Sequence, residues 1–274
     1  MQNQGRLMLP NGLFKAFVLG AVQGAAEWLP ISSTGHLRIV EKALGVEAPL
    51  LLDVSLHAAT LAVTLLYFRS DIKRLLSALL TLDFKSEYGK LIPLIVVGTV
   101  PTTIIGLASV VFLQDLFYDF SAIAMFFLAC GIVLYASRVG GEHGSSISYF
   151  EAFIIGAVQG LAVLPGLSRS GLTIATALLL GISREKAFKF SFLLSIPAVI
   201  GAFGLTLYTG YGELASSVLS LPDLLAGAAA AFVMGFFAIR ILWKTVYRRL
   251  FHYFAFYCWI LGAFLLASSA CGFF

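Results

Sequence analysis

Two short polar runs interrupt a largely apolar sequence, and both hold residues that could bind or cleave a phosphate group. The first run follows Glu27 and contains Ser33 and His36, whereas the second contains Arg169. A charged side chain at the centre of a bilayer costs about 2.5 to 3.5 kcal/mol on insertion scales. Glu27 and Arg169 are therefore candidates for function.

A structural ion pair between Glu27 and Arg169 is the alternative to a functional site. The hydroxyl groups beside these two residues are more numerous than one ion pair needs, which favours a binding site. They belong to Ser32, Ser33, Thr34, Ser168, Ser170 and Thr173.

Each polar run also predicts the start of a short helix, at residues 32–35 and at 168–171. The free backbone amides and the positive dipole end of a helix N-terminus attract anions. Two such N-termini facing each other, with the fork of Arg169 between them, describe a pocket for phosphate or pyrophosphate. The predicted substrate-binding residues are Ser32, Thr34, Gly35, Ser168, Ser170, Gly171 and Thr173.

Glu27 has the wrong sign for direct contact with phosphate. Its carboxylate suits a divalent cation that bridges to phosphate oxygens, or the transfer of a proton. Gln23 lies one helical turn earlier on the same face and offers a neutral oxygen. Glu27 and Gln23 are therefore the predicted ligands of a divalent cation, Mg²⁺ or Ca²⁺.

Four further side chains have more than one interpretation. His36 is a nucleophile, a general acid, or a residue at a helix start that a carbonyl satisfies, and Ser33 is a nucleophile or a helix cap. Asp53 and His57 are spaced i, i+4 near the end of an apolar run, as an interfacial pair or as a pair behind the site. This last signal is weak.

The elements that carry the two polar runs form an internal repeat. Segments starting at Phe14 and Phe150, at an offset of 136, agree at 11 of 22 positions. Each copy has about 14 apolar residues before a proline and a Ser/Gly-rich turn, which is too short to span a bilayer and predicts a re-entrant helical hairpin. An odd number of spans between the copies would invert the second hairpin and bring both turns to a midplane site.

The composition predicts an integral membrane protein, with 59% hydrophobic and 12% charged residues. Six apolar runs have the length of spanning helices. They cover residues 50–68, 91–113, 121–137, 190–208, 224–242 and 251–270. The expected fold is an all-α polytopic membrane protein with an inverted-topology repeat, six transmembrane helices and two re-entrant hairpins. Residues 1–274 would form one membrane domain, from repeat 1 (about 12–138) and repeat 2 (about 148–272).

The charge distribution predicts the orientation. Of 18 Lys and Arg residues, 13 fall in the loops after the first, third and fifth runs or in adjoining helix ends, which alternating spans place on one side. This side is cytoplasmic by the positive-inside bias. The connections at residues 114–120 and 209–221 contain neither residue type, so both chain ends are expected outside. The basic residues form no aromatic-interleaved patch, and no nucleic-acid partner is expected.

With these residues the sequence resembles the undecaprenyl-pyrophosphate phosphatase family, also called the bacitracin-resistance proteins. The resemblance rests on Gln23, Glu27, Pro30 and residues 32–36 in the first copy, and on residues 165–170 with Thr173 in the second. The stretch FSFLLSIP at residues 190–197 is a third likeness. Many members have Glu where this chain has Gln23, which puts in doubt any mechanism that needs two carboxylates.

The resemblance implies hydrolysis of a polyprenyl pyrophosphate to the monophosphate and inorganic phosphate, which recycles the lipid carrier of cell-wall glycans and confers bacitracin resistance. It implies a site open to the outer face of the cytoplasmic membrane and a divalent cation. The implied catalytic residues are Glu27, Ser33, His36 and Arg169. Transfer to Ser33, to His36 or directly to water all remain possible routes.

A transporter or lipid flippase is the rival interpretation, because inverted repeats with broken helices are also transporter architecture. A flippase must hold phosphate but needs neither a nucleophile nor a metal-binding acid, and this sequence offers both. A homodimer formed through apolar faces is a further possibility.

Overall fold

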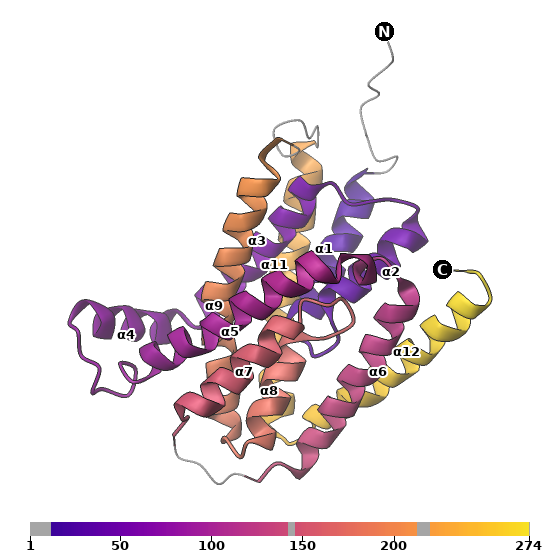
Figure 1. The fold of residues 1–274 in the computed structure, drawn as a ribbon. Helices are drawn as coiled ribbons and strands as arrows, with labels where there is room; N and C mark the ends of the chain where they lie inside the picture. The colour runs from indigo at the N-terminus through magenta and orange to yellow at the C-terminus, as the bar shows by residue number, and fades with distance from the viewer. Residues whose placement is uncertain (1–11, 142–145, 213–219, 274) are drawn as a thin grey trace.

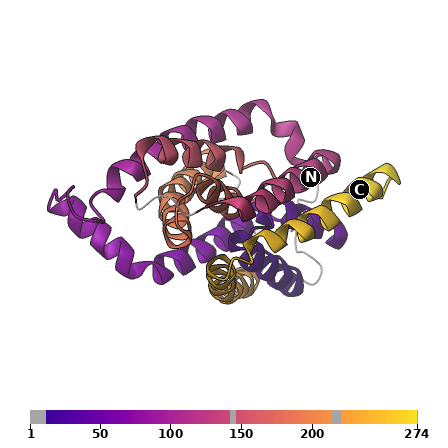
Figure 2. The ribbon, with the colours of Figure 1, turned by 90° about the horizontal axis from the view of Figure 1, so that it is seen from below.

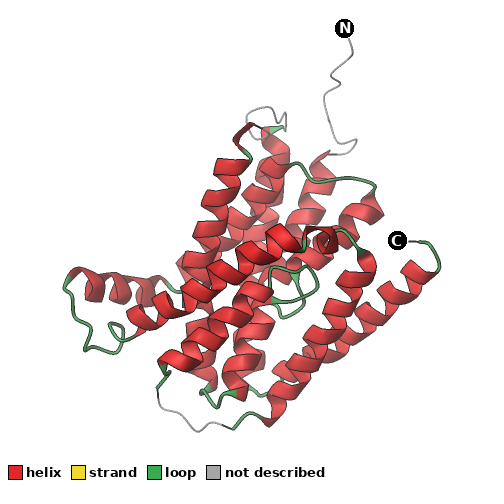
Figure 3. Cartoon of the chain, in the orientation of Figure 1, coloured by secondary structure: helices red, strands yellow, loops and turns green. Residues whose placement is uncertain are grey.

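The structure is a computed structural model that describes residues 12–141, 146–212 and 220–273 (Figure 1). All regular structure in these ranges is helical, which confirms the all-α prediction (Figure 3). The α-helices are α1 (Gly12–Trp28), α2 (Ser33–Leu44), α3 (Leu50–Tyr67), α4 (Arg69–Leu80), α5 (Leu91–Phe112), α6 (Phe120–Ala136), α7 (Tyr149–Leu161), α8 (Arg169–Leu179), α9 (Arg184–Thr209), α11 (Leu221–Tyr247) and α12 (Phe254–Ala270).

Six helices in the described residues are long and apolar enough to cross a membrane, as the six apolar runs predict. They are α3, α5, α6, α9, α11 and α12. The span at α6 includes the 3₁₀ turn that follows it (Ser137–Val139), and the span at α12 includes the 3₁₀ turn that precedes it (Phe251–Tyr253). Two of them, α9 and α11, are longer than the apolar runs that predict them. A charged first or last turn ends the apolar run in the sequence. The backbone stays helical there, because the charged turn can extend into water.

The helix α4 is absent from the sequence-based expectation, which has a cytoplasmic loop there. It projects from the body of the molecule beside the start of α5 (Figure 1). Only Ala78 of this helix is buried. The predicted outer position of the chain ends concerns residues 1–11 and 274, and much of the connection at 209–221 is residues 213–219; these lie outside the described residues.

The two predicted hairpins are α1 with α2 and α7 with α8, and none of these four helices is among the six candidate spans. The turns are built alike. Ser32 caps α2 by accepting a hydrogen bond from the amide of Gly35, at 3.4 Å, and Ser168 caps α8 by accepting one from Gly171, at 3.2 Å. The interpretation of Ser33 as the helix cap is therefore wrong, since Ser32 has that role and Ser33 is the first helical residue.

Glycines let the hairpin helices approach their neighbours closely. A Cβ atom at Gly20 of α1 would lie 2.1 Å from the carbonyl oxygen of Gly227 in α11, and one at Gly156 of α7 would lie 2.0 Å from that of Gly98 in α5. No side chain fits at such distances, so these positions require glycine. These glycines therefore serve close helix packing in both copies.

The halves of the chain interlock. The most extensive helix pairs are α1 with α11, α5 with α7, and α6 with α12, and each pair joins a helix before residue 140 to one after residue 148. The α6 and α12 helices lie side by side in the view of Figure 1 and in the perpendicular view of Figure 2. This arrangement brings the turns of the two hairpins together inside the bundle.

Candidate active site

The two hairpin turns are hydrogen-bonded to each other. The amide of Gly166 donates to Ser32 Oγ at 2.9 Å, and Ser170 Oγ donates to the carbonyl of Trp28 at 2.8 Å. Ser32 has a positive φ of 65°, a conformation that is uncommon for a residue with a side chain. Its hydroxyl accepts from both hairpins at once, which fixes this conformation and joins the two copies. The turns therefore meet, as the sequence predicts.

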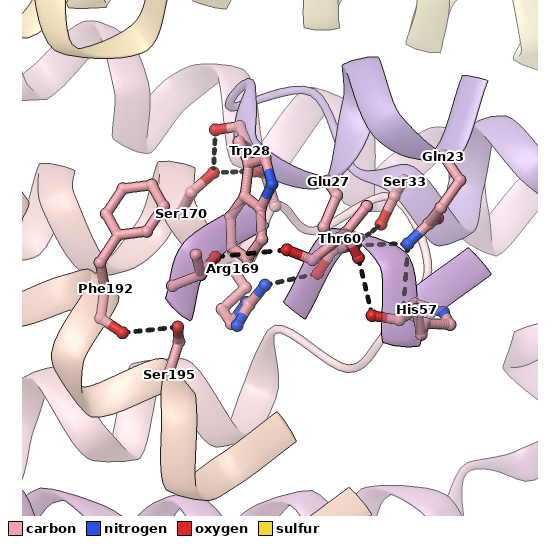
Figure 4. A network of polar contacts seen from close by, with 12 residues as sticks. Gln23, Glu27, Trp28, Ser33, His57, Thr60, Arg169, Ser170, Phe192 and Ser195 are labelled. Atoms are coloured by element: carbon pink, nitrogen blue, oxygen red, sulfur yellow. Dashed lines mark hydrogen bonds and ion pairs between the residues drawn. The ribbon is translucent and has the colours of Figure 1, made fainter. Parts of the chain in front are cut away.

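Glu27, at the end of α1, is the centre of a polar network (Figure 4). Its Oε1 accepts from Arg169 Nη2 at 2.5 Å. Its Oε2 accepts from Ser33 Oγ at 2.5 Å and from Gln23 Nε2 at 3.1 Å. Three donors around one carboxylate hold it as an anion. A serine hydroxyl that donates to a carboxylate is also the arrangement of a nucleophile with its base.

Arg169 begins α8 and reaches across to the first hairpin. Its guanidinium carbon lies 5.1 Å from the centroid of the Trp28 ring, a cation–π contact. Its Nη1 is buried and has no hydrogen-bond partner among the described residues. Because a guanidinium has five N–H groups in a planar fork, this nitrogen is a donor available to a bound anion.

A cavity of about 530 Å³ opens beside the network. Glu27, Ser33 and Arg169 line its polar end. Apolar side chains of α5, α9 and the segment after α7 line the rest, among them Leu107, Val110, Val163, Phe203 and Leu205. One end of the cavity can hold a charged group and the remainder can hold hydrocarbon.

The predicted substrate-binding residues divide into two groups. Ser32, Thr34 and Ser168 line the cavity together with the catalytic candidates. The others support the turns from behind. The amides of Gly35 and Gly171 are taken by the helix caps, Ser170 is bonded to Trp28, and Thr173 Oγ1 donates to the carbonyl of Arg169 at 2.7 Å. These four are not among the residues that line the cavity.

The structure does not bring His36 to this network. Its Nδ1 donates to the carbonyl of Ser32 at 2.8 Å, so its Nε2 is left to accept from the Tyr257 hydroxyl at 2.5 Å. The ring is stacked on Tyr257 of α12, with centroids 5.6 Å apart, and meets the edge of Phe127. His36 does not line the cavity. Its place agrees with the interpretation of a helix-start residue satisfied by a carbonyl.

His57 is the site residue that sequence analysis undervalues. Its Nδ1 lies 3.0 Å from Gln23 Nε2, its Nε2 lies 3.7 Å from Asp53 Oδ1, and both His57 and Asp53 line the cavity. The i, i+4 spacing of Asp53 and His57 is the signal for this pair. Nothing in the spacing indicates that the pair meets Gln23.

Oxygen ligands for a cation are few in the described residues. No group of three or more His, Cys, Asp or Glu residues there could hold a metal ion. Gln23 is fully buried, and its Oε1 has no hydrogen-bond partner among the residues described. This oxygen and the Glu27 carboxylate are a partial donor set for a hard cation, which commonly completes its coordination with water and substrate phosphate.

The family model of the bacitracin resistance protein BacA matches residues 16–264. The undecaprenyl-diphosphatase of Carboxydothermus hydrogenoformans is 38% identical over 264 residues, which cover 94% of this chain and 98% of that protein. Those of Desulfosudis oleivorans and Methanobrevibacter smithii are 42% and 36% identical, with 89% and 94% of this chain covered and 94% and 98% of theirs. The chain therefore belongs to the bacitracin resistance protein BacA family, as its motifs indicate.

Proposed function

We propose that this protein is a membrane phosphatase that hydrolyses a polyprenyl pyrophosphate of the undecaprenyl type to the monophosphate and inorganic phosphate. The observation that carries the proposal is the Ser33–Glu27–Arg169 network in the wall of a largely apolar cavity. The relatives named undecaprenyl-diphosphatase support the same substrate. The reaction would return a lipid carrier for cell-wall synthesis and confer resistance to bacitracin.

Ser33 is the nucleophile that this geometry favours. Its Oγ attacks the terminal phosphorus while its proton passes to Glu27 Oε2, 2.5 Å away. The bond from that phosphorus to the bridging oxygen breaks, and the polyprenyl monophosphate leaves with the proton that Glu27 gives up. Water then attacks the phosphoserine and gives a proton to Glu27, the bond from phosphorus to Ser33 Oγ breaks, Oγ takes that proton from Glu27, and inorganic phosphate leaves.

Arg169 holds the terminal phosphate during both steps. Its Nη1 is the available donor, and the two helix N-termini add a positive field at the same place. Charge that develops on the phosphate oxygens is stabilised by donors that are already in position. The prenyl chain lies along the apolar side of the cavity, between α5 and α9.

A divalent cation, Mg²⁺ or Ca²⁺, would bind at Glu27 and Gln23. The unpartnered Gln23 Oε1 and the carboxylate are the donors that support this assignment. When bound, the cation would supply neutralising charge for the pyrophosphate.

Phosphate release by the purified protein in detergent tests the proposed function. A lipid flippase that uses the same pocket needs a closed membrane to act, whereas hydrolysis does not. Release of inorganic phosphate from polyprenyl pyrophosphate, with a phosphoryl group trapped on Ser33 after rapid acid quench, is the expected result. Binding of the lipid without any phosphate release would favour the flippase.

The site would open to the outer face of the cytoplasmic membrane, with both chain ends outside. The positive-inside bias of the loops supports this orientation. Single cysteines at Asp115 and Ser146, in a variant without other cysteines, should react from opposite sides with an impermeant maleimide. Reaction of both cysteines from the same side would contradict the orientation.

A homodimer remains part of the proposal, and the mass of the protein in detergent is directly measurable.

A further inference from the structure

We infer that His57, with Asp53 behind it, is a positioning residue that fixes the amide of Gln23 and thereby the carboxylate of Glu27. The inference rests on the proposed function, because it concerns the base that accepts the proton of Ser33. His57 comes from α3, outside both hairpins, and lies 34 residues from Gln23 in the sequence. It contacts neither Glu27 nor Ser33 in any hydrogen bond of the described residues.

The contacts of Gln23 determine the direction of each hydrogen bond. Glu27 is a carboxylate that accepts from Arg169 and Ser33, so the group of Gln23 that faces it at 3.1 Å must be the NH₂ and not the oxygen. The same nitrogen lies 3.0 Å from His57 Nδ1, which must then accept. The ring proton is consequently on Nε2, the nitrogen nearest Asp53.

The Gln23 amide is therefore the donor in both contacts. Both N–H groups of the Gln23 amide are used, one on Glu27 and one on His57, and its oxygen accepts no hydrogen bond from the described residues. Without an acceptor at Nδ1, the second N–H of a fully buried amide would be unsatisfied. The amide would then rotate to find another partner, and Glu27 Oε2 would lose the donor that it has besides Ser33.

The surroundings of His57 favour a rigid support over an incidental contact. The Thr60 hydroxyl donates to the backbone carbonyl of His57 at 3.0 Å, and Thr60 is buried against the bundle. Leu56, the residue before His57, is also buried, and its side chain lies against Gly227 of α11. The imidazole is therefore held by a packed stretch of α3 and reaches into the cavity from a fixed base.

Two polar substitutions of similar size test the inference. The side-chain oxygen of Asn can take the place of Nδ1, whereas Gln reaches toward the place of Nε2 and leaves no acceptor beside Gln23. His57→Asn should keep kcat within about threefold of the parent, and His57→Gln should lose about tenfold or more, the effect of one lost hydrogen bond to an ordered polar network. KM for polyprenyl pyrophosphate should stay within about twofold in both variants, because Arg169 and the helix N-termini hold the phosphates.

The matched control is Thr64→Val, two turns further along α3, which removes a buried hydroxyl that donates to the carbonyl of Thr60 and contacts neither His57 nor Gln23. Its kcat should equal that of the parent. Equal kcat for the Asn and Gln variants, or a change confined to KM, would overturn the inference even if the proposed function stands. If the parent itself releases no phosphate, the proposed function fails. In that case a double-mutant cycle of His57→Gln with Gln23→Leu, measured by thermal unfolding, still decides whether the two side chains are coupled.

Discussion

Removal of the Arg169 charge should destabilise the protein as well as inactivate it. The side chains of Glu27 and Arg169 are only 10% and 15% exposed. In Arg169→Met the Glu27 carboxylate would keep two neutral donors, Ser33 and Gln23, and lose its guanidinium partner. Removing one partner of a buried ion pair lowers the free energy of unfolding by about 3 to 5 kcal/mol. For a chain of this size we expect Tm to fall on the order of 10 °C.

The double variant Glu27→Gln with Arg169→Met separates stability from catalysis. It leaves no unpaired charge, so most of the lost stability should return. The coupling between the two substitutions should be about 2 kcal/mol or more, the size found for contacting residues in one network. Phosphate release should remain absent in all three variants, because the single changes remove the phosphate donor or the base and the double change removes both.

Thermal unfolding in detergent and phosphate release from polyprenyl pyrophosphate are the two measurements. A double variant that releases phosphate at close to the parental rate would show that the arginine only neutralises Glu27, and would refute its assignment to the phosphate. An Arg169→Met variant that unfolds at the parental temperature would refute the argument from the buried carboxylate.

Three further variants follow from the packing around the site. Ser33→Ala should lower kcat by roughly 1000-fold or more with little change in Tm, since it removes the nucleophile; kcat near the parental value would point to direct attack by water. Tyr257→Phe should lower the free energy of unfolding by about 1 kcal/mol with kcat changed less than threefold, because its hydroxyl holds His36 outside the cavity; a large loss of kcat would place His36 in the reaction. Gly24→Val should prevent folding or lower Tm strongly, because a Cβ atom there would lie 2.3 Å from a carbonyl oxygen of α11. The control Gly201→Val, at a position with no atom within 4 Å of the added Cβ, should leave Tm unchanged.

The spanning helices and the hairpin turns could be predicted from the sequence, because both depend on local properties. A run of about 20 apolar residues has few alternatives to a spanning helix. A proline followed by serines and a glycine ends one helix and caps the next in either copy. The helix α4 was missed although its sequence carries a signal, because apolar residues at 72, 75, 76, 79 and 80 recur at the i, i+3, i+4 spacing of an amphipathic helix.

The directions of the site side chains depend on partners far away in the sequence. Ser33 and His36 are both in the first turn of α2, and their spacing alone puts them near one face of the helix. His36 nevertheless turns to Tyr257, 221 residues later, because α12 packs beside this turn. The contact of His57 with Gln23 is likewise formed by the packing of α3 on α1, which no local pattern encodes.

A comparison of the two copies within the chain shows which residues build the site and which react. Equivalent positions hold the same residue where the structure needs a cap or a buried amide: Ser32 and Ser168 cap their helices, and Gln23 and Gln159 are both buried. Gln159 donates to Thr102 and to the carbonyl of Leu194, at 3.3 and 3.4 Å.

The copies differ at equivalent positions that line the cavity. Glu27 corresponds to Val163, and Ser33 corresponds to Arg169; all four line the cavity. In the proposed mechanism one hairpin would contribute the base and the nucleophile, while the other would contribute the phosphate donor. Two identical hairpins would place either two carboxylates or two guanidinium groups in one desolvated space, and the repulsion between like charges would oppose the assembly. Ser32 and Ser168 can be the same residue because each caps a helix of the scaffold, whereas Glu27 and Arg169 must have opposite charges for the network to close.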